Sequence, residues 1–232
     1  MYGISNTDTE LDEENSMKNP ITSYAKTKWE AECFLKEYSS ESFSIVCFRP
    51  STVFGASPRL RCDIVFNNFV ACAYTTGLIE IKSDGTPWRP VIHIKDVCNA
   101  IIAGLIAPKE VINSKSFNIG IKNGNFSVKD LAEAASNSVP GTKLIFTGEH
   151  GKDSRTYRVS FNRILNELKP WYKPSWNLEK GAKELVDLFK KVNFSEKDFR
   201  GPKTNRLDQL KKLSTSKILD QDLRWLQSTR IN

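Results

Sequence analysis

The stretch of residues 19–38 constrains the fold most, because it predicts a helix with a tyrosine and a lysine on one face. Asn19 is a favoured N-cap, Pro20 suits the first helical position, and most of the residues that follow are strong helix formers. Tyr24 and Lys28 stand four residues apart in this helix, so their side chains share a face.

A phenol beside an ammonium group can act as an acid–base catalyst. The positive charge favours the ionised phenol, which is the form that accepts a proton. One lysine supplies only part of the stabilisation that such a base needs, and a cationic cofactor ring can supply the rest. A Tyr-x-x-x-Lys pair also arises by chance, and by itself it describes equally well an exposed helical pair with no role. The surrounding motifs therefore decide between the two interpretations.

Two motifs follow the helix. Residues 43–48 form a short apolar segment that predicts a buried parallel strand, and residues 49–55 continue it as Arg-Pro-Ser-Thr-Val-Phe-Gly. Residues 85–97 read Gly-Thr-Pro-Trp-Arg-Pro-Val-Ile-His-Ile-Lys-Asp-Val. Together with the Tyr-Gly pair at residues 2–3, this order and spacing resembles the extended short-chain dehydrogenase/reductases, specifically their NAD-dependent nucleotide-sugar epimerase/dehydratase group. The resemblance extends to about residue 189.

The resemblance implies a fold, a cofactor and a reaction. The expected fold is the C-terminal part of a dinucleotide-binding, Rossmann-type parallel sheet, joined to a small mixed α/β substrate domain. The expected cofactor is NAD rather than NADP, and the expected substrate is a nucleotide-sugar. Tyr24 would take a proton from a sugar hydroxyl while a hydride passes to the nicotinamide, giving a keto-sugar, and Lys28 would bind the nicotinamide ribose. The sequence does not say whether epimerisation or dehydration follows.

Five further ligand contacts are implied by the same resemblance. Ser51 would contact the nicotinamide side of the cofactor, and Thr52 and Asn67 the substrate. Arg89 would grip the diphosphate, a role that suits the planar fork of arginine, and Arg155 would contact the nucleotide end of the substrate. Ordinary strand-to-loop polarity is the alternative for the serine and the threonine. A solvated or structural arginine is the alternative for Arg89.

Two features of the family do not occur in this sequence. No Gly-x-x-Gly-x-x-Gly appears among the 12 glycines, so the turn that cradles the phosphates of the cofactor is missing. The serine or threonine that works with the tyrosine in the family precedes the Tyr-Gly pair and is missing as well. We therefore expect the C-terminal part of an enzyme. The alternative is a catalytically inactive remnant that serves as a binding or interaction module.

Composition bears on partners and compartment. The net charge of +7 raises the possibility of nucleic-acid binding, but much of the excess lies beyond residue 180, where basic and acidic residues alternate without an RNA-binding aromatic signature. We expect no nucleic-acid and no membrane partner, because no apolar run approaches the ~20 residues of a membrane span. Five cysteines without a C-x-x-C pair indicate a reduced, cytoplasmic setting, and two histidines argue against a histidine-rich metal site. The family implies a homodimer.

The chain is expected to divide at two points. Residues 1–56 would be the remnant of the dinucleotide-binding domain, residues 57–192 mainly the substrate domain, and residues 193–232 a tail that packs on the domain or on a partner. Helix signals in the second part are Gly77 as a C-terminal stop and three predicted N-caps, at Asp96, Ser127 and Asn177. In the apolar segment around His93, we expect the histidine to be a hydrogen-bonded core residue.

Overall fold

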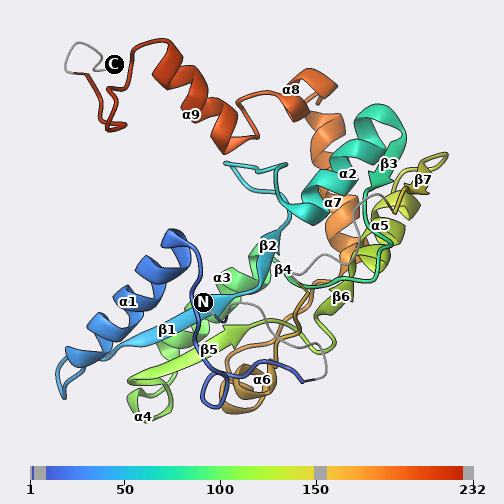
Figure 1. The fold of residues 1–232 in the computed structure, drawn as a ribbon. Helices are drawn as coiled ribbons and strands as arrows, with labels where there is room; N and C mark the ends of the chain where they lie inside the picture. Colours follow the sequence, from blue (N-terminus) through green and yellow to red (C-terminus); the bar gives the residue numbers. More distant parts are fainter. Residues whose placement is uncertain (1, 3–8, 149–155, 227–232) are drawn as a thin grey trace.

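The computed structural model describes Tyr2, residues 9–148 and residues 156–226 (Figure 1). The helices are α1 (Ser23–Glu37), α2 (Val65–Thr76), α3 (Ile94–Ile106), α4 (Lys109–Ile112), α5 (Val128–Asn137), α6 (Asn162–Glu167), α7 (Leu178–Lys191), α8 (Glu196–Arg200) and α9 (Arg206–Thr215). The strands are β1 (Val46–Pro50), β2 (Thr52–Phe54), β3 (Leu78–Ile81), β4 (Trp88–His93), β5 (Lys115–Ile119), β6 (Asn125–Ser127) and β7 (Lys143–Phe146). Arg155 lies outside the described residues.

Parallel pairing dominates the strands and confirms the expected α/β class. β1 runs parallel to β5 with Arg49 beside Asn118, β2 runs parallel to β4, and β3 runs parallel to β7. The short β6 adds to β4 in the antiparallel direction. The first strand begins at Val46 and not at Phe43 as expected, because the backbones of Ser40 and Phe43 hydrogen-bond to each other in a turn.

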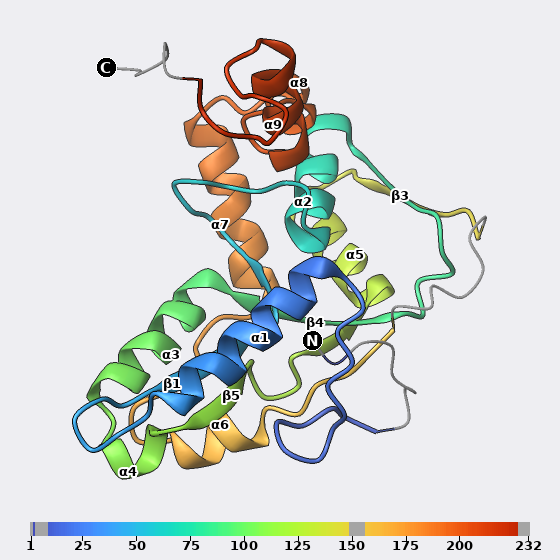
Figure 2. The same cartoon turned by 60° about the vertical axis from the view of Figure 1, so that its left-hand side comes forward.

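Two hydrophobic cores lie on either side of β2 and β4 (Figures 1 and 2). One core packs α3 and α6 against β1 and β5, and includes Ala100, Phe117, Ile119 and Ile164. The other packs α2, α5 and α7 with β3, and includes Phe66, Ile79, Leu131, Leu185 and Phe189. Val91 and Ile92 are neighbours in β4 and belong to different cores, because successive side chains of a strand point to opposite faces. The central strands therefore join the two halves of the molecule.

Two of the predicted helix starts are wrong. The first helix begins after Thr22, whose Oγ1 accepts a hydrogen bond from Ala25 N at 3.1 Å, so Asn19 does not cap it and Pro20 lies before it. α3 begins three residues earlier than expected, because the ring of His93 accepts from Lys95 N and acts as its N-cap.

Asp96 lies inside the first turn of α3 and has another use. Its two carboxylate oxygens accept hydrogen bonds from Ser175 N at 3.0 Å and Trp176 N at 3.1 Å. These bonds fix the segment that leads into α7. The sequence pattern assigned this carboxylate to the end of the helix. It instead accepts from two backbone N–H groups that are distant in the sequence and would otherwise be unpaired.

Other local signals are confirmed. Ser127 and Asp130 form a reciprocal capping box at the start of α5, and Asn177 accepts from Lys180 N at the start of α7. Gly77 ends α2 in the left-handed conformation at φ 67°. Each of these devices depends only on residues within one turn, which is why the sequence reveals them.

The C-terminal segment divides into a packed and a projecting part. Phe194 stacks on Phe189 with ring centroids 4.3 Å apart, and Phe199 is buried in the same core. The described helix α9 buries none of its side chains and projects from the rest of the molecule (Figure 1). Among the helices that the structure describes, none is long and apolar enough to cross a lipid bilayer.

Candidate active site

Helix α1 brings Tyr24 and Lys28 together as the spacing predicts. The Lys28 ammonium lies 5.9 Å from the centre of the Tyr24 ring, and the tyrosine side chain is 74% exposed. Within the described part of the chain, Lys28 forms no ion pair. The exposed face of α1 therefore presents a phenol and a cation to whatever binds there.

A buried ion pair fixes α1 to the sheet. Glu32 is the one buried side chain among the residues of α1, all of which are described, and it lies at the end of β1 against Arg49. Ser116 of β5 donates a further hydrogen bond to Glu32, at 2.5 Å. Burial tends to raise the pKa of Glu32, but the hydrogen bonds from Arg49 and Ser116 outweigh it and lower that pKa. The carboxylate is therefore ionised and holds the helix by charge.

Ser51 and Thr52 lie at the carboxyl end of β1, where ligands bind in open α/β sheets. The backbone N–H and the hydroxyl of Ser51 both donate to the carbonyl of Ile119, at 3.1 and 2.9 Å. Thr52 begins β2 and pairs with Val91 of β4. The serine hydroxyl therefore links the ends of β1 and β5, and its oxygen can still accept a hydrogen bond.

Asn67 holds the loop that follows these strands. Its Oδ1 accepts from Gly55 N at 3.0 Å, its Nδ2 donates to the carbonyl of Arg61 at 2.8 Å, and its side chain is buried. Both polar ends of the amide are thus used inside the chain. The predicted contact of Asn67 with a substrate stays a prediction, and the structure adds a bracing role for this residue.

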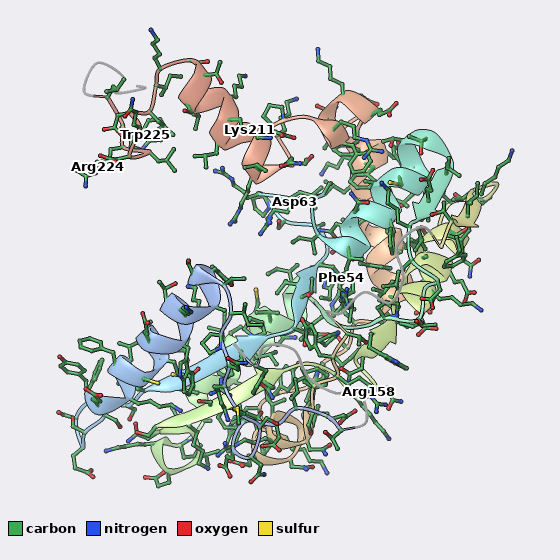
Figure 3. All side chains as sticks on the ribbon, viewed as in Figure 1. Phe54, Asp63, Arg158, Lys211, Arg224 and Trp225 are labelled. Atoms are coloured by element: carbon green, nitrogen blue, oxygen red, sulfur yellow. The ribbon has the colours of Figure 1, made fainter. Side chains whose placement is uncertain are left out.

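Arg89 lies on β4 opposite Phe126 of β6. Its Nη1 donates to the carbonyl of Trp88 at 2.8 Å. The guanidinium of Arg158 lies 5.5 Å from the Trp88 ring centre, so a second arginine is close to the same strand (Figure 3). Arg155, which the sequence predicts to contact the nucleotide end of the substrate, is outside the described residues.

His93 is a core residue, as the sequence predicts. Its ring stacks on Trp176 with centroids 3.9 Å apart, and its Nε2 lies 2.8 Å from Glu184 Oε2. Burial lowers the pKa of His93, and the hydrogen bond to Glu184 opposes this only in part. The histidine therefore joins β4 to α7 in its neutral form.

Sequence reasoning missed two groups near the strand ends. Glu184 Oε2 accepts from Ala56 N at 3.1 Å, and Glu184 Oε1 lies 2.6 Å from the Lys95 ammonium. In the sequence, nothing distinguishes this glutamate from a surface acid of an amphipathic helix. Arg61 and Asp63 form a two-point ion pair in the loop after β2. Residues 57–61 form a basic turn in the sequence, but the pairing of Arg61 with Asp63 is not evident from it.

A family profile described as the NAD dependent epimerase/dehydratase family matches residues 1–120. The chain belongs to this family. Among curated proteins it is similar to the dTDP-D-glucose 4,6-dehydratase of Mus musculus, with 28% identity over 202 residues. That alignment covers 82% of this chain and 53% of the mouse protein, so the chain spans about half the length of this relative.

Solved structures show the same fold. The UDP-glucuronic acid 4-epimerase of Bacillus cereus, in complex with UDP-glucuronic acid and NAD, superposes with a TM-score of 0.66 at 24% identity. The UDP-glucose 4-epimerase of Thermotoga maritima, with UDP-glucose, superposes with a TM-score of 0.68 at 22% identity. These comparisons cover 82% and 83% of this chain, and 59% and 60% of the two enzymes.

Proposed function

We propose that this chain supplies the acid–base pair and the substrate side of an NAD-dependent nucleotide-sugar epimerase or dehydratase. The observation that carries the proposal is the pair of Tyr24 and Lys28 on one exposed face of a helix anchored through Glu32. In this role Tyr24 takes a proton from a sugar hydroxyl and later returns one, while Lys28 favours the ionised phenol. Whether the product is an epimer or a dehydrated sugar depends on residues beside the serine or threonine that this sequence lacks.

The cofactor would be held in part by this chain. The phenol of Tyr24 and the ammonium of Lys28 are hydrogen-bonding groups on one open face, which fits the hydroxyls of a nicotinamide ribose. Ser51 would approach the nicotinamide side. The chain contains no Gly-x-x-Gly-x-x-Gly, so the pyrophosphate would need a cradle from elsewhere. When bound, NAD supplies the hydride acceptor for oxidation of the sugar.

The substrate would lie between α1 and the ends of β2 and β4. Thr52 and Asn67 would contact the sugar, and Arg89 and Arg155 would hold the diphosphate and the nucleotide. Arginine suits this task because its planar fork can hold two phosphate oxygens. The homodimer and the cytoplasmic location expected from the family are part of the same proposal.

The surface around β1 supports the view that a further part of the enzyme docks there. Within the described residues, β1 pairs with β5 on one edge and with no second strand, and none of its residues is fully buried. Exposed apolar side chains flank it: Phe34 and Leu35 on α1, Tyr38 just after α1, and Ile101, Ile102, Leu105 and Ile106 on α3. Parallel sheets are normally covered on both faces. The dinucleotide-binding half of the enzyme would cover this surface.

The second candidate is a catalytically inactive chain that binds a nucleotide-sugar. The missing phosphate cradle favours it, because the substrate side of the site is more complete than the cofactor side. Sequencing the DNA upstream of the Met1 codon separates the two. An open reading frame that encodes a strand followed by Gly-x-x-Gly-x-x-Gly supports the enzyme, and a stop codon in every frame supports the binding protein.

Calorimetry tests the substrate side directly. The isolated chain should bind dTDP-glucose or UDP-glucose more tightly than NAD, because Arg89 and its neighbours contact the nucleotide-sugar. Arg89→Ala should weaken this binding, whereas Arg59→Ala, an exposed arginine in the loop after β2, should not. Tighter binding of NAD than of every nucleotide-sugar tested would contradict the proposal.

A further inference from the structure

Glu184 of α7 connects three elements beside the proposed site. Its Oε2 lies 2.8 Å from His93 Nε2 of β4 and accepts from Ala56 N at 3.1 Å, and its Oε1 lies 2.6 Å from the Lys95 ammonium. His93 Nδ1 accepts from Lys95 N, so the neutral ring carries its proton on Nε2 and donates it to Glu184. The carboxylate therefore accepts from three donors, one of which is the backbone of the loop that follows β2.

The loop of residues 55–64 leads from β2, which carries Thr52, to α2, which carries Asn67 (Figures 1 and 3). These are the two residues predicted to contact the sugar. Asn67 accepts from the first backbone N–H of the loop, and Glu184 accepts from the second, which is that of Ala56. Within the described residues, Ala56 N donates to no other group. Two side chains, one from α2 and one from α7, therefore set the path by which the chain leaves β2.

Close packing brings α7 to the start of this loop. Gly181 lies one turn before Glu184, and a Cβ on it would lie 2.3 Å from the ring of Phe54, the last residue of β2. Gly55 has a left-handed φ of 109°, and a Cβ on it would lie 2.3 Å from His93 Nε2. Only glycine fits at both points, so the helix comes near enough for Glu184 to reach the backbone.

We propose that Glu184 is a positioning residue for the substrate side of this site. It holds the first turn of the loop of residues 55–64, and thereby the relative positions of Thr52 and Asn67. The proposal rests on the function proposed above, in which these two residues contact the sugar. A carboxylate suits the position because its oxygens only accept hydrogen bonds and all three of its partners are donors. A glutamine of the same size would turn an N–H group toward one of those donors.

Hydrogen exchange at the Ala56 amide tests the contact without any ligand. Mass spectrometry with fragmentation to single residues should find this amide protected in the wild-type chain. Exchange there as fast as in an unfolded chain would overturn the proposal with no variant needed. Glu184→Gln should speed the exchange about tenfold, the scale of one hydrogen bond to a charged group. Glu179→Gln makes the same substitution at an exposed position of the same helix and should leave the exchange unchanged.

Calorimetry with UDP-glucose and dTDP-glucose tests the consequence for the site. In the folded Glu184→Gln chain, binding of the nucleotide-sugar should weaken about tenfold. Lys95→Gln changes the partner of Oε1 but keeps the bond to Ala56, so it should weaken binding far less. A carboxylate with a purely structural role would lower the unfolding temperature and leave the affinity of the folded chain as it was.

Two further results would count against Glu184. One is equal exchange at Ala56 in the folded Glu184→Gln and wild-type chains. The other is unchanged affinity in a folded Glu184→Gln chain whose Ala56 amide exchanges faster. Failure of the wild-type chain to bind either nucleotide-sugar would contradict the proposed function instead, and the exchange at Ala56 would then decide alone whether Glu184 holds the loop.

Discussion

Arg49 makes a two-point contact with Glu32, with Nε 3.0 Å from Oε2 and Nη2 2.6 Å from Oε1, and this contact joins the end of β1 to the middle of α1. The two side chains are only 8% and 6% exposed. Phe34 and Leu35 of the same helix are exposed, and Trp29 is only half-buried, with its ring centre 5.6 Å from the guanidinium carbon of Arg49. Charge and hydrogen bonding, and not apolar packing, therefore set the position of the helix that carries Tyr24.

Removing the arginine should destabilise the fold strongly. Arg49→Ala leaves the carboxylate of Glu32 buried without its main partner, and the expected loss in the free energy of unfolding is about 3–5 kcal/mol. Urea unfolding followed by circular dichroism measures it. Lys129→Ala, which breaks an exposed pair with Glu133, is the control and should change stability little.

A double variant distinguishes a buried charge from simple loss of packing. Glu32→Leu combined with Arg49→Met replaces both charges by apolar groups of similar size. The double variant should be more stable than Arg49→Ala, because no uncompensated charge remains. If the double variant were the less stable of the two, the ion pair would not be the main anchor of α1.

The pH dependence of stability should contain a step from His93. Its pKa is lowered in the folded chain by burial, so the unfolded chain takes up the proton at higher pH. Stability from this group is complete above its unfolded pKa of about 6.5 and falls as the pH drops through that value. Paired carboxylates such as Glu184, whose pKa is lowered, affect the pH dependence of stability in a more acidic range.

Thermal unfolding between pH 5 and 8 measures that step. The midpoint should decline from pH 7 to pH 5 in the wild-type chain. His93→Gln should unfold at a lower temperature at pH 7, because the stacking on Trp176 is weakened, but with a flatter profile over this interval. A profile of unchanged slope in His93→Gln would show that other groups cause the decline.

The sequence predicts structural features that depend on neighbouring residues, but it does not predict hydrogen bonds between distant segments. The spacing of Tyr24 and Lys28, the Ser127–Asp130 capping box and the stop at Gly77 depend on one or two helical turns, and the structure contains them all. Asn67 shows the limit. Its position fitted a ligand contact, yet both ends of its amide hold a loop whose path depends on the packing of α2.

The N-cap predictions failed for a related physical reason. Asp96 is a good cap by residue type, but the chain between α6 and α7 returns to it with two backbone donors. The ring nitrogen of His93 then takes the capping position. Such competition among partners far apart in the sequence is decided by the tertiary fold and is not visible in a single sequence.

The exposed apolar faces beside β1 should make the isolated chain associate. Leu105 of α3 is 79% exposed and lies in an apolar stripe with Ile101, Ile102 and Ile106, which are exposed as well, and contiguous exposed apolar surface favours association. Light scattering after size exclusion should find oligomers or aggregates. Ile102→Lys with Leu105→Lys should shift the chain toward monomer, whereas Leu207→Lys on the projecting α9 serves as a matched change elsewhere. A monodisperse wild-type monomer with one sharp unfolding transition would contradict this expectation.

The acid–base assignment is tested by supplying the dinucleotide-binding half, fused or as a second chain, and measuring turnover of a nucleotide-sugar. Tyr24→Phe keeps the ring but removes the hydroxyl of the proposed base, so kcat should fall by roughly 10²–10⁴-fold, the usual contribution of general acid–base catalysis. Lys28→Ala should lower both NAD affinity and kcat, because in the proposed role the ammonium binds the ribose and favours the ionised phenol. Tyr38→Phe alters an exposed tyrosine next to α1 and should leave both unchanged. If Tyr24→Phe retained full kcat while the fold stayed intact, the proton would have to leave through another group, and the base would need to be sought among the residues of the added half.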